Sequence, residues 1–190
     1  MQRPRLARWP VAAVLSLSAL GSLFAAVAGQ RLRRVEVAGD SMWPGLAAGD
    51  FLLLRRGAPP PDRAAGAIVA FEGPHVPGAP PRPDVLLKRV VGLPGEMLRV
   101  GAEVEINGRL LEEPYRRGIA PEGSYRGVHA VPPDSFFVLG DAREQSTDSR
   151  ELGAITADRV LGEAIWRYWP PRRFGPIRRP RRSWTPSPKG

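Results

Sequence analysis

The feature that most constrains this chain is an uncharged apolar run of eighteen residues, Val11 to Ala28, with three arginines on either side. As a helix the run would reach about 27 Å, which is close to the hydrocarbon thickness of a bilayer. A cleavable secretory signal is the alternative, because Ala26-Val27-Ala28 offers an A-x-A cleavage pattern, although the run is longer than the usual apolar core of such signals. A buried soluble helix is a third interpretation. We predict a basic segment over residues 1–10 and one transmembrane anchor over residues 11–29.

The net charge of +9 is carried by the two ends of the chain. Residues 1–34 and 170–190 together supply +13 without a single acid, so the body between them has a net charge of −4. A mildly acidic body is a poor surface for nucleic acid, whereas basic ends beside an apolar run suit a lipid bilayer. The proline-rich composition of residues 170–190 predicts a disordered basic tail.

The scarcity of cysteine and histidine limits the catalytic and metal-binding chemistry that the chain can carry out. It contains no cysteine, which excludes thiol catalysis and disulfides. Its two histidines, His75 and His129, lie far apart in the chain and do not form a metal-ligand pattern. Serine chemistry would therefore need a base other than histidine. We expect neither a metal nor a cofactor.

From residue 30 onward the pattern predicts strands. Short apolar or alternating runs are separated by Gly- and Pro-rich turns, and no convincing amphipathic helix interrupts them. The predicted strands are Val35–Val37, Phe51–Leu54, Ala67–Phe71, Asp84–Val91, Met97–Val100, Val104–Ile106, Arg109–Leu111, Ser135–Leu139 and Val160–Trp169. Asn107-Gly108 is a strong two-residue hairpin signal. The sequence predicts a mostly β protein, with one compact folded sheet or barrel over residues 30–169.

Three segments could carry chemistry. In the first, Ser41 follows Gly39-Asp40 after a strand, where a serine can be exposed beside backbone N–H groups. An ordinary turn with a capping serine is the alternative for this segment alone. The third segment, residues 139–150, is a strand that runs into a loop rich in acids, hydroxyls and arginine. Such a loop is either a surface turn or a buried polar network around a site.

The second segment contains Lys88, in the most apolar strand of the body. Of 28 basic residues only Lys88 and Lys189 are lysines, so a lysine here stands out against arginine. It is either solvated at a sheet edge or desolvated with a lowered pKa. Desolvation would let Lys88 act as a general base near neutral pH, which arginine cannot do.

Together, the three segments resemble the signal peptidase I family of membrane serine proteases. The matching motifs are Ser41-Met42-x-Pro44-x-Leu46 with Gly49-Asp50, then Lys88-Arg89-Val90-Val91-Gly92-Leu93-Pro94-Gly95-Glu96, then Gly140-Asp141-x-Arg143-x-x-Ser146-x-Asp148-Ser149-Arg150. Each motif is weak or moderate alone, but three in order behind an apolar segment are specific. The resemblance covers about residues 11–168.

The resemblance implies a catalytic role for Ser41 as nucleophile and for Lys88 as general base. Ser146 would bond to the Lys88 amine, and the Ser41 backbone N–H would contribute to the oxyanion hole. Some members carry a hydroxyl at the position of Gly39, where this chain has no side-chain donor. Gly45 stands where threonine is usual, and Ala142 where asparagine is common.

Structural ion pairs and a peptide-binding strand follow from the same resemblance. The implied ion pairs are Arg89 with Asp141 and Asp148 with Arg150. The implied substrate contacts are Met42, Leu86 and Leu87, and the substrate would add a strand beside the lysine strand.

The resemblance also predicts the substrate and the location. The chain would remove signal peptides from exported preproteins after small residues, as a single-pass protein of the cell membrane with its catalytic domain on the outer face. A Ser/Lys processing peptidase with few substrates is an alternative. A membrane-anchored β-domain without enzymatic activity and a self-cleaving repressor-type protein are further alternatives, and both are less consistent with three ordered motifs.

Overall fold

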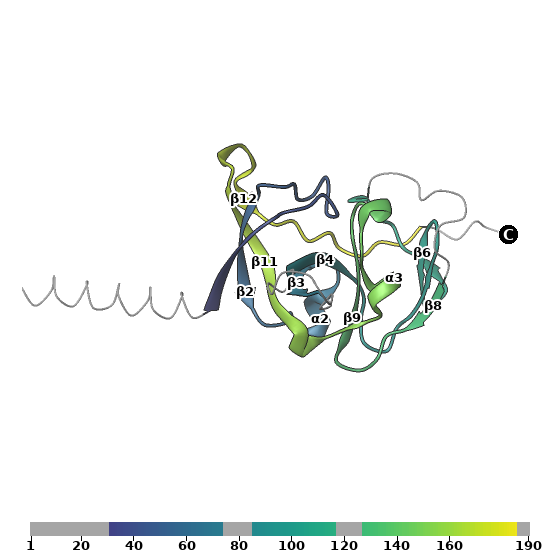
Figure 1. Ribbon diagram of the computed structural model, residues 1–190. Coiled ribbons are helices and arrows are strands. Elements are labelled where there is room, and N and C mark those ends of the chain that lie inside the picture. Colours follow the sequence, from purple (N-terminus) through teal and green to yellow (C-terminus); the bar gives the residue numbers. More distant parts are fainter. Residues whose placement is uncertain (1–30, 74–84, 117–126, 186–190) are drawn as a thin grey trace, which may run out of the picture.

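The computed structural model describes residues 31–73, 85–116 and 127–185, and this part of the chain is mostly β, as the sequence predicts (Figure 1). The predicted anchor over residues 11–29 lies outside the described residues. Within them, no helix is both long enough and apolar enough to cross a membrane.

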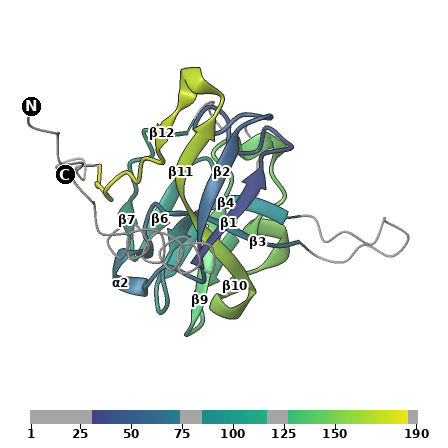
Figure 2. The ribbon, with the colours of Figure 1, turned by 90° about the vertical axis from the view of Figure 1, so that its left-hand side faces the viewer.

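A large sheet of eight strands forms the main body. In spatial order its strands are β1 (Leu32–Glu36), β2 (Phe51–Arg56), β11 (Val160–Trp169), β3 (Ile68–Glu72), β4 (Val85–Gly92), β9 (Ser135–Leu139) and β10 (Ile155–Thr156), and β12 (Gly175–Pro176) pairs with β11. The neighbouring strands in this order run antiparallel. The strand β4 lies between β3 and β9 (Figure 2). The pairing with β3 covers residues 85–89 of β4, whereas β9 pairs only with Arg89, Val90 and Gly92, so residues 85–88 are not paired with β9.

A second, smaller sheet is inserted between β4 and β9 in the chain. Its strands, in spatial order, are β7 (Arg109–Leu110), β6 (Val104–Ile106), β5 (Met97–Val100) and β8 (Gly127–Ala130). The turn between β6 and β7 is the predicted Asn107-Gly108 hairpin. Both residues have positive φ, 51° and 76°, which is the geometry that favours this residue pair.

Several elements differ from the sequence prediction. The strands β8, β10 and β12 and the short helices were not predicted. The strands β10 and β12 have only two residues each and no hairpin signal beside them, and β8 lies in a Gly- and Pro-rich stretch. The helical turns are α2 (Pro61–Ala64), η1 (Arg143–Gln145), α3 (Ser149–Leu152), η2 (Ala157–Arg159) and η3 (Pro171–Arg173), each too short to show an amphipathic period.

The largest difference concerns the predicted disordered tail. Residues 175–185, which we call the strap, run from the large sheet to the small one (Figure 1). The strap begins beside β11, where the Ile177 N–H donates to the Ile165 carbonyl at 3.0 Å, and ends where the Thr185 N–H donates to the Leu110 carbonyl at 3.1 Å. The side chain of Trp184 packs against the core of the small sheet. Ordered contacts therefore extend at least to residue 185.

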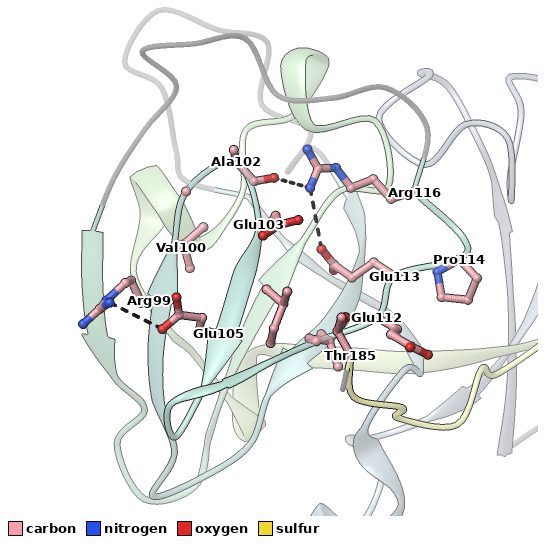
Figure 3. A pocket seen from close by; sticks show the side chains of 13 residues that line it. Arg99, Val100, Ala102, Glu103, Glu105, Glu112, Glu113, Pro114, Arg116 and Thr185 are labelled. Atoms are coloured by element: carbon pink, nitrogen blue, oxygen red, sulfur yellow. Dashed lines mark hydrogen bonds and ion pairs between the residues drawn. The ribbon is translucent and has the colours of Figure 1, made fainter. Parts of the chain in front are cut away.

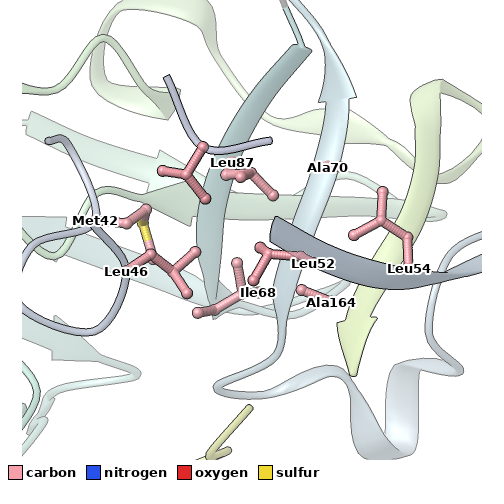
Figure 4. Close-up of a cluster of buried hydrophobic side chains, with 9 residues drawn as sticks. Met42, Leu46, Leu52, Leu54, Ile68, Ala70, Leu87 and Ala164 are labelled. Carbon is pink, nitrogen blue, oxygen red and sulfur yellow. The ribbon is translucent and has the colours of Figure 1, made fainter. Parts of the chain in front are cut away.

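Three clusters of buried apolar side chains hold the sheets together. The first lies beneath the turn that contains Ser41 and is drawn in Figure 4. Its buried members are Val37, Met42, Leu46, Leu52, Leu54, Ile68, Ala70, Leu87 and Ala164. Apolar residues two apart in β2 and β4 point into these clusters, as the period of a strand requires. The turn that follows β1 is thus fixed from below by its own Met42 and Leu46.

Candidate active site

The turn between β1 and β2 presents Ser41 at the surface of the first cluster. The Leu46 N–H donates to the Met42 carbonyl at 2.8 Å, and the side chains of both residues are buried (Figure 4). The Trp43 N–H donates to the Asp40 carbonyl at 2.9 Å. Ser41 is only half-buried, so its hydroxyl is held by a rigid turn and remains accessible.

Lys88 lies directly beside this hydroxyl. Its Nζ is 2.7 Å from the Ser41 Oγ, although 47 residues separate the two in sequence. The side chain emerges from β4, opposite Val69 of β3, and the residue is only 2% exposed. The alternative of a solvated lysine at a sheet edge is therefore excluded.

Burial changes the protonation of Lys88. Loss of hydration lowers its pKa from the ordinary value of 10.5 to about 8, since a charged amine is disfavoured away from water. The nearby carboxylates of Asp148 and Asp141 act in the opposite direction, and Arg150 adds to the lowering. Neutral amine is therefore available near physiological pH, which is the condition for a general base.

The loop after β9 is organised around the buried carboxylate of Asp148. Its Oδ2 accepts hydrogen bonds from the Gly140 N–H at 2.9 Å and from the Ser146 hydroxyl at 2.8 Å. Its Oδ1 accepts from the Arg150 Nε at 2.8 Å. The structure therefore differs from the expectation that Ser146 bonds to the Lys88 amine: between these two described residues there is no hydrogen bond. The Ser146 hydroxyl instead orients Asp148, whose charge acts on Lys88.

A second buried ion pair lies beside the turn that carries Ser41. Arg89 donates to Asp141 through Nε at 2.8 Å and through a terminal nitrogen at 2.6 Å, and the two side chains are 3% and 0% exposed. Burial raises the pKa of Asp141, and the pairing with Arg89 opposes that rise. The Ala142 N–H donates to the Ser41 carbonyl at 3.0 Å, so this loop holds the Ser41 backbone directly.

The lack of a side chain at Gly45 fits this packing. A Cβ at Gly45 would lie 3.1 Å from the Asp141 carboxylate, within reach of the Arg89–Asp141 pair. In contrast, a Cβ at Gly39 would meet nothing within 4 Å. The site therefore leaves room at Gly39 for the hydroxyl that this chain lacks.

Sequence reasoning did not identify a third group of supporting residues. Buried Asp50 binds Arg167 at 2.9 Å and Arg173 at 3.4 Å. Arg173 also donates to the carbonyls of Pro44 and Gly45 at 3.1 Å, so it holds the end of the turn that carries Ser41. Gly49-Asp50 was visible as part of a motif, but its partners lie more than 115 residues away and carry no local signal.

The predicted substrate contacts are divided between two clusters. Met42 and Leu87 belong to the first cluster, beneath the turn that carries Ser41. Leu86 points to the opposite side of β4 and packs against the second cluster. Among the described residues, no group of three His, Cys, Asp or Glu side chains is placed to hold a metal ion.

A half-buried serine hydroxyl beside a buried lysine of lowered pKa is the arrangement that a serine hydrolase with an amine base requires. Comparison with known proteins identifies the group to which the chain belongs. Residues 6–169 match the family model described as "Signal peptidase, peptidase S26". The chain belongs to this signal peptidase family. The strap lies beyond the matched residues.

Individual relatives agree with the family match. Signal peptidase I of Leptolyngbya laminosa is 38% identical over 144 residues, which cover 73% of this chain and 69% of that protein. Signal peptidase I of Bacillus caldolyticus is 31% identical over 153 residues, covering 73% of this chain and 80% of the other. The crystal structure of a signal peptidase I from Enterococcus faecalis V583 is 27% identical and covers 52% of this chain and 93% of that one, with a TM-score of 0.41.

Proposed function

We propose that this protein is a signal peptidase I-type endopeptidase in which Ser41 is the nucleophile and Lys88 the general base. The observation that carries the proposal is the 2.7 Å distance between the Lys88 Nζ and the Ser41 Oγ. It is supported by the burial of Lys88 and by the lowering of its pKa to about 8. Membership of the family supports the reaction class.

The proposed reaction begins with neutral Lys88. Its amine takes the Ser41 proton as the Oγ attacks the scissile carbonyl. The Ser41 backbone N–H contributes to stabilising the oxyanion. The Lys88 ammonium then gives its proton to the leaving amine as the C–N bond breaks, which leaves an ester acyl-enzyme and a neutral lysine. Lys88 next takes a proton from a water molecule that attacks the ester, and it returns this proton to the Ser41 Oγ as the acid product leaves. Asp148 holds the loop beside Lys88, with Ser146 and Arg150 as its partners.

The proposed substrates are preproteins whose signal peptides end in small residues. An extended segment would lie beside β4, with Met42 and Leu87 beneath it. The apolar run before the described residues would anchor the protein in the cell membrane, with the catalytic domain on the outer face. The chain would then meet its substrates at the bilayer surface, because about a dozen residues separate the run from Ser41.

The test compares wild type with Ser41→Ala, Lys88→Ala and Lys88→Arg in cleavage of a preprotein, followed by N-terminal sequencing of the product. We expect all three variants to be inactive while folded by circular dichroism. Lys88→Arg is decisive, because arginine supplies the same charge but does not deprotonate in proteins. Substantial cleavage by a folded Lys88→Arg variant would contradict the Ser/Lys mechanism.

Substrate specificity is tested with the same assay. Replacing the Ala at the −1 position of the substrate with Phe should abolish cleavage, since a binding site for a small −1 residue would be too shallow to hold the larger ring. Equal turnover of the two substrates would contradict a small-residue specificity. The result is independent of the Lys88 variants, so the mechanism and the specificity can fail separately.

A further inference from the structure

A buried ion pair joins the small sheet to the loop after β9, residues 140–148, which we call the catalytic loop. The side chains of Glu113 and Arg143 are 5% and 4% exposed, and they are in direct hydrogen-bonded contact. Glu113 belongs to residues 111–116, which leave β7 and which we call the arm. Arg143 belongs to η1, in the loop that carries Asp148. The arm therefore contacts the loop that supports Lys88, although 30 residues separate the two partners.

Arg143 in turn fixes the backbone at Gly140. Its Nε donates to the Gly140 carbonyl at 2.9 Å. Gly140 is packed so tightly that an added Cβ would lie 2.7 Å from the Ser41 carbonyl and would collide with the Ser146 side chain. A displacement of the Gly140 peptide would therefore be transmitted to both Ser41 and Ser146.

Tyr115, also in the arm, contacts both buried ion pairs. Its hydroxyl donates to Glu113 at 2.9 Å, and the guanidinium carbon of Arg89 lies 4.2 Å from the centre of its ring. A cation over a ring face is attracted by the ring's quadrupole, most strongly when the contact is desolvated. Burial and the neighbouring Glu113 raise the pKa of the Tyr115 hydroxyl, so it stays protonated as a donor.

The charges around Arg143 indicate that it requires the carboxylate of Glu113. Arg143 lies in the catalytic loop, which adjoins Arg150 and Lys88, and a buried cation needs a counter-charge. Figure 3 shows Glu113 beside Arg116, at the rim of a hollow of about 850 Å³ next to the small sheet. The hollow is lined by neither Ser41 nor Lys88, so Glu113 acts from behind the site.

We propose that Glu113 and Tyr115 are positioning residues that hold the catalytic loop through Arg143 and Arg89. The small sheet then has a mechanistic role. Its arm fixes the position of the loop after β9, which carries Asp148 and bonds to the Ser41 backbone through the Ala142 N–H. This proposal rests on the proposed function, since it assumes Ser41 and Lys88 to be the reacting groups.

The experiment measures kcat and KM of the full chain in detergent micelles, with a fluorogenic peptide that contains an A-x-A site. We expect Glu113→Gln and Tyr115→Leu to lower kcat by about 10- to 100-fold, the scale of a misplaced catalytic group, with KM changed less than twofold. Tyr115→Phe keeps the ring over Arg89 and should retain more activity than Tyr115→Leu. Glu105→Gln is the matched control, because it removes a half-exposed carboxylate of the same sheet and should leave kcat unchanged.

A double variant separates positioning from a loss of folding. Glu113→Gln alone takes the carboxylate from both Arg143 and Arg116 and can unfold the chain. Glu113→Gln/Arg143→Gln removes both charges of the shorter pair and leaves only Arg116, which is 3.9 Å from Glu113 and also lies near Glu103. Kinetic constants are expressed per folded molecule, from circular dichroism and thermal unfolding. We expect the double variant to lose no more kcat than the worse single variant, since the two residues act as one unit.

Two outcomes would overturn the proposal. One is wild-type kcat per folded molecule in both Glu113→Gln/Arg143→Gln and Tyr115→Leu. The other is independent, multiplicative losses of kcat from Glu113→Gln and Arg143→Gln. Cleavage by Ser41→Ala, measured in parallel, would instead overturn the proposed function, so the two failures are distinguishable.

Discussion

The titration of Lys88 gives a prediction that can be worked from the structure. A pKa of about 8 leaves the amine neutral in roughly one molecule in ten at pH 7, whereas the ordinary value of 10.5 would leave it neutral in roughly one in three thousand. We therefore expect kcat/KM to rise about tenfold per pH unit below pH 8 and to level off above it. A profile that is flat between pH 6 and 9 would contradict a titrating lysine base.

The same shift has a consequence for stability. Because the folded pKa is lower than the unfolded one, the folded state binds fewer protons between about pH 8 and 10.5, and stability rises with pH across that window. The shift corresponds to about 3 kcal/mol of destabilisation at pH 7, where the buried amine is charged. Roughly 2 kcal/mol of this should be recovered by pH 9.5.

Lys88→Met isolates this effect, because methionine fills a similar volume and does not titrate. Urea unfolding gives the free energy of unfolding of both proteins at pH 7 and at pH 9.5. In the difference between the two proteins at each pH, the contributions of the other titrating groups cancel. We expect Lys88→Met to be inactive, more stable than wild type at pH 7, and closer to wild type at pH 9.5. A stability difference that stays constant between the two pH values would refute the burial argument.

Three further predictions test the surroundings of the site. Ser146→Ala should lower kcat by about 10- to 1,000-fold without unfolding the chain, measured by peptide cleavage and circular dichroism; an unchanged kcat would remove this hydroxyl from the site. Gly140→Ala should abolish cleavage because its Cβ would press on the Ser41 carbonyl, while Gly39→Ala, at an open position, should stay folded and active. Trp184→Ala should destabilise the protein by about 1–3 kcal/mol in thermal unfolding, because it removes partly buried apolar surface from the strap; an unchanged melting temperature would mean that the strap contributes little.

Local patterns were sufficient to predict the strands and the hairpin. The apolar runs that became β2, β4 and β9 are bounded by turn residues, and the backbone of Asn107-Gly108 has the predicted positive φ angles. The same patterns could not supply β8, which lies in a Gly- and Pro-rich stretch, or β10, which has two residues and no hairpin signal of the kind that marks β6 and β7. Pairing across the sheet, which places β4 in the interior, depends on partners that are distant in sequence.

The candidate site was predictable in its residues and in part of its contacts, since the implied ion pairs Arg89–Asp141 and Asp148–Arg150 are both present. The motifs named Ser41, Lys88 and Ser146, and the structure places the first two 2.7 Å apart. The hydrogen-bond partner of Ser146 was not predictable, because Asp148, two residues away, competes with Lys88 for its hydroxyl. In the structure the Ser146 hydroxyl donates to Asp148 at 2.8 Å. Glu113 carried no signal, since an acid that follows Glu112 and precedes Pro114 resembles any solvated residue.

The strap changes the meaning of the charge distribution. The sequence places an acidic body between basic ends and favours a membrane role for both ends. In the structure, however, several arginines of the tail form ion pairs with carboxylates of the body. Arg173 pairs with Asp50, Arg179 with Glu163, and Arg182 with Glu96, the last at 2.8 Å. These carboxylates are buried or half-buried, and the tail arginines add to the pairing of Asp50 with Arg167 and of Glu163 with Arg55. A composition typical of disorder is therefore compatible with order, because each of these arginines meets a fixed carboxylate on the body.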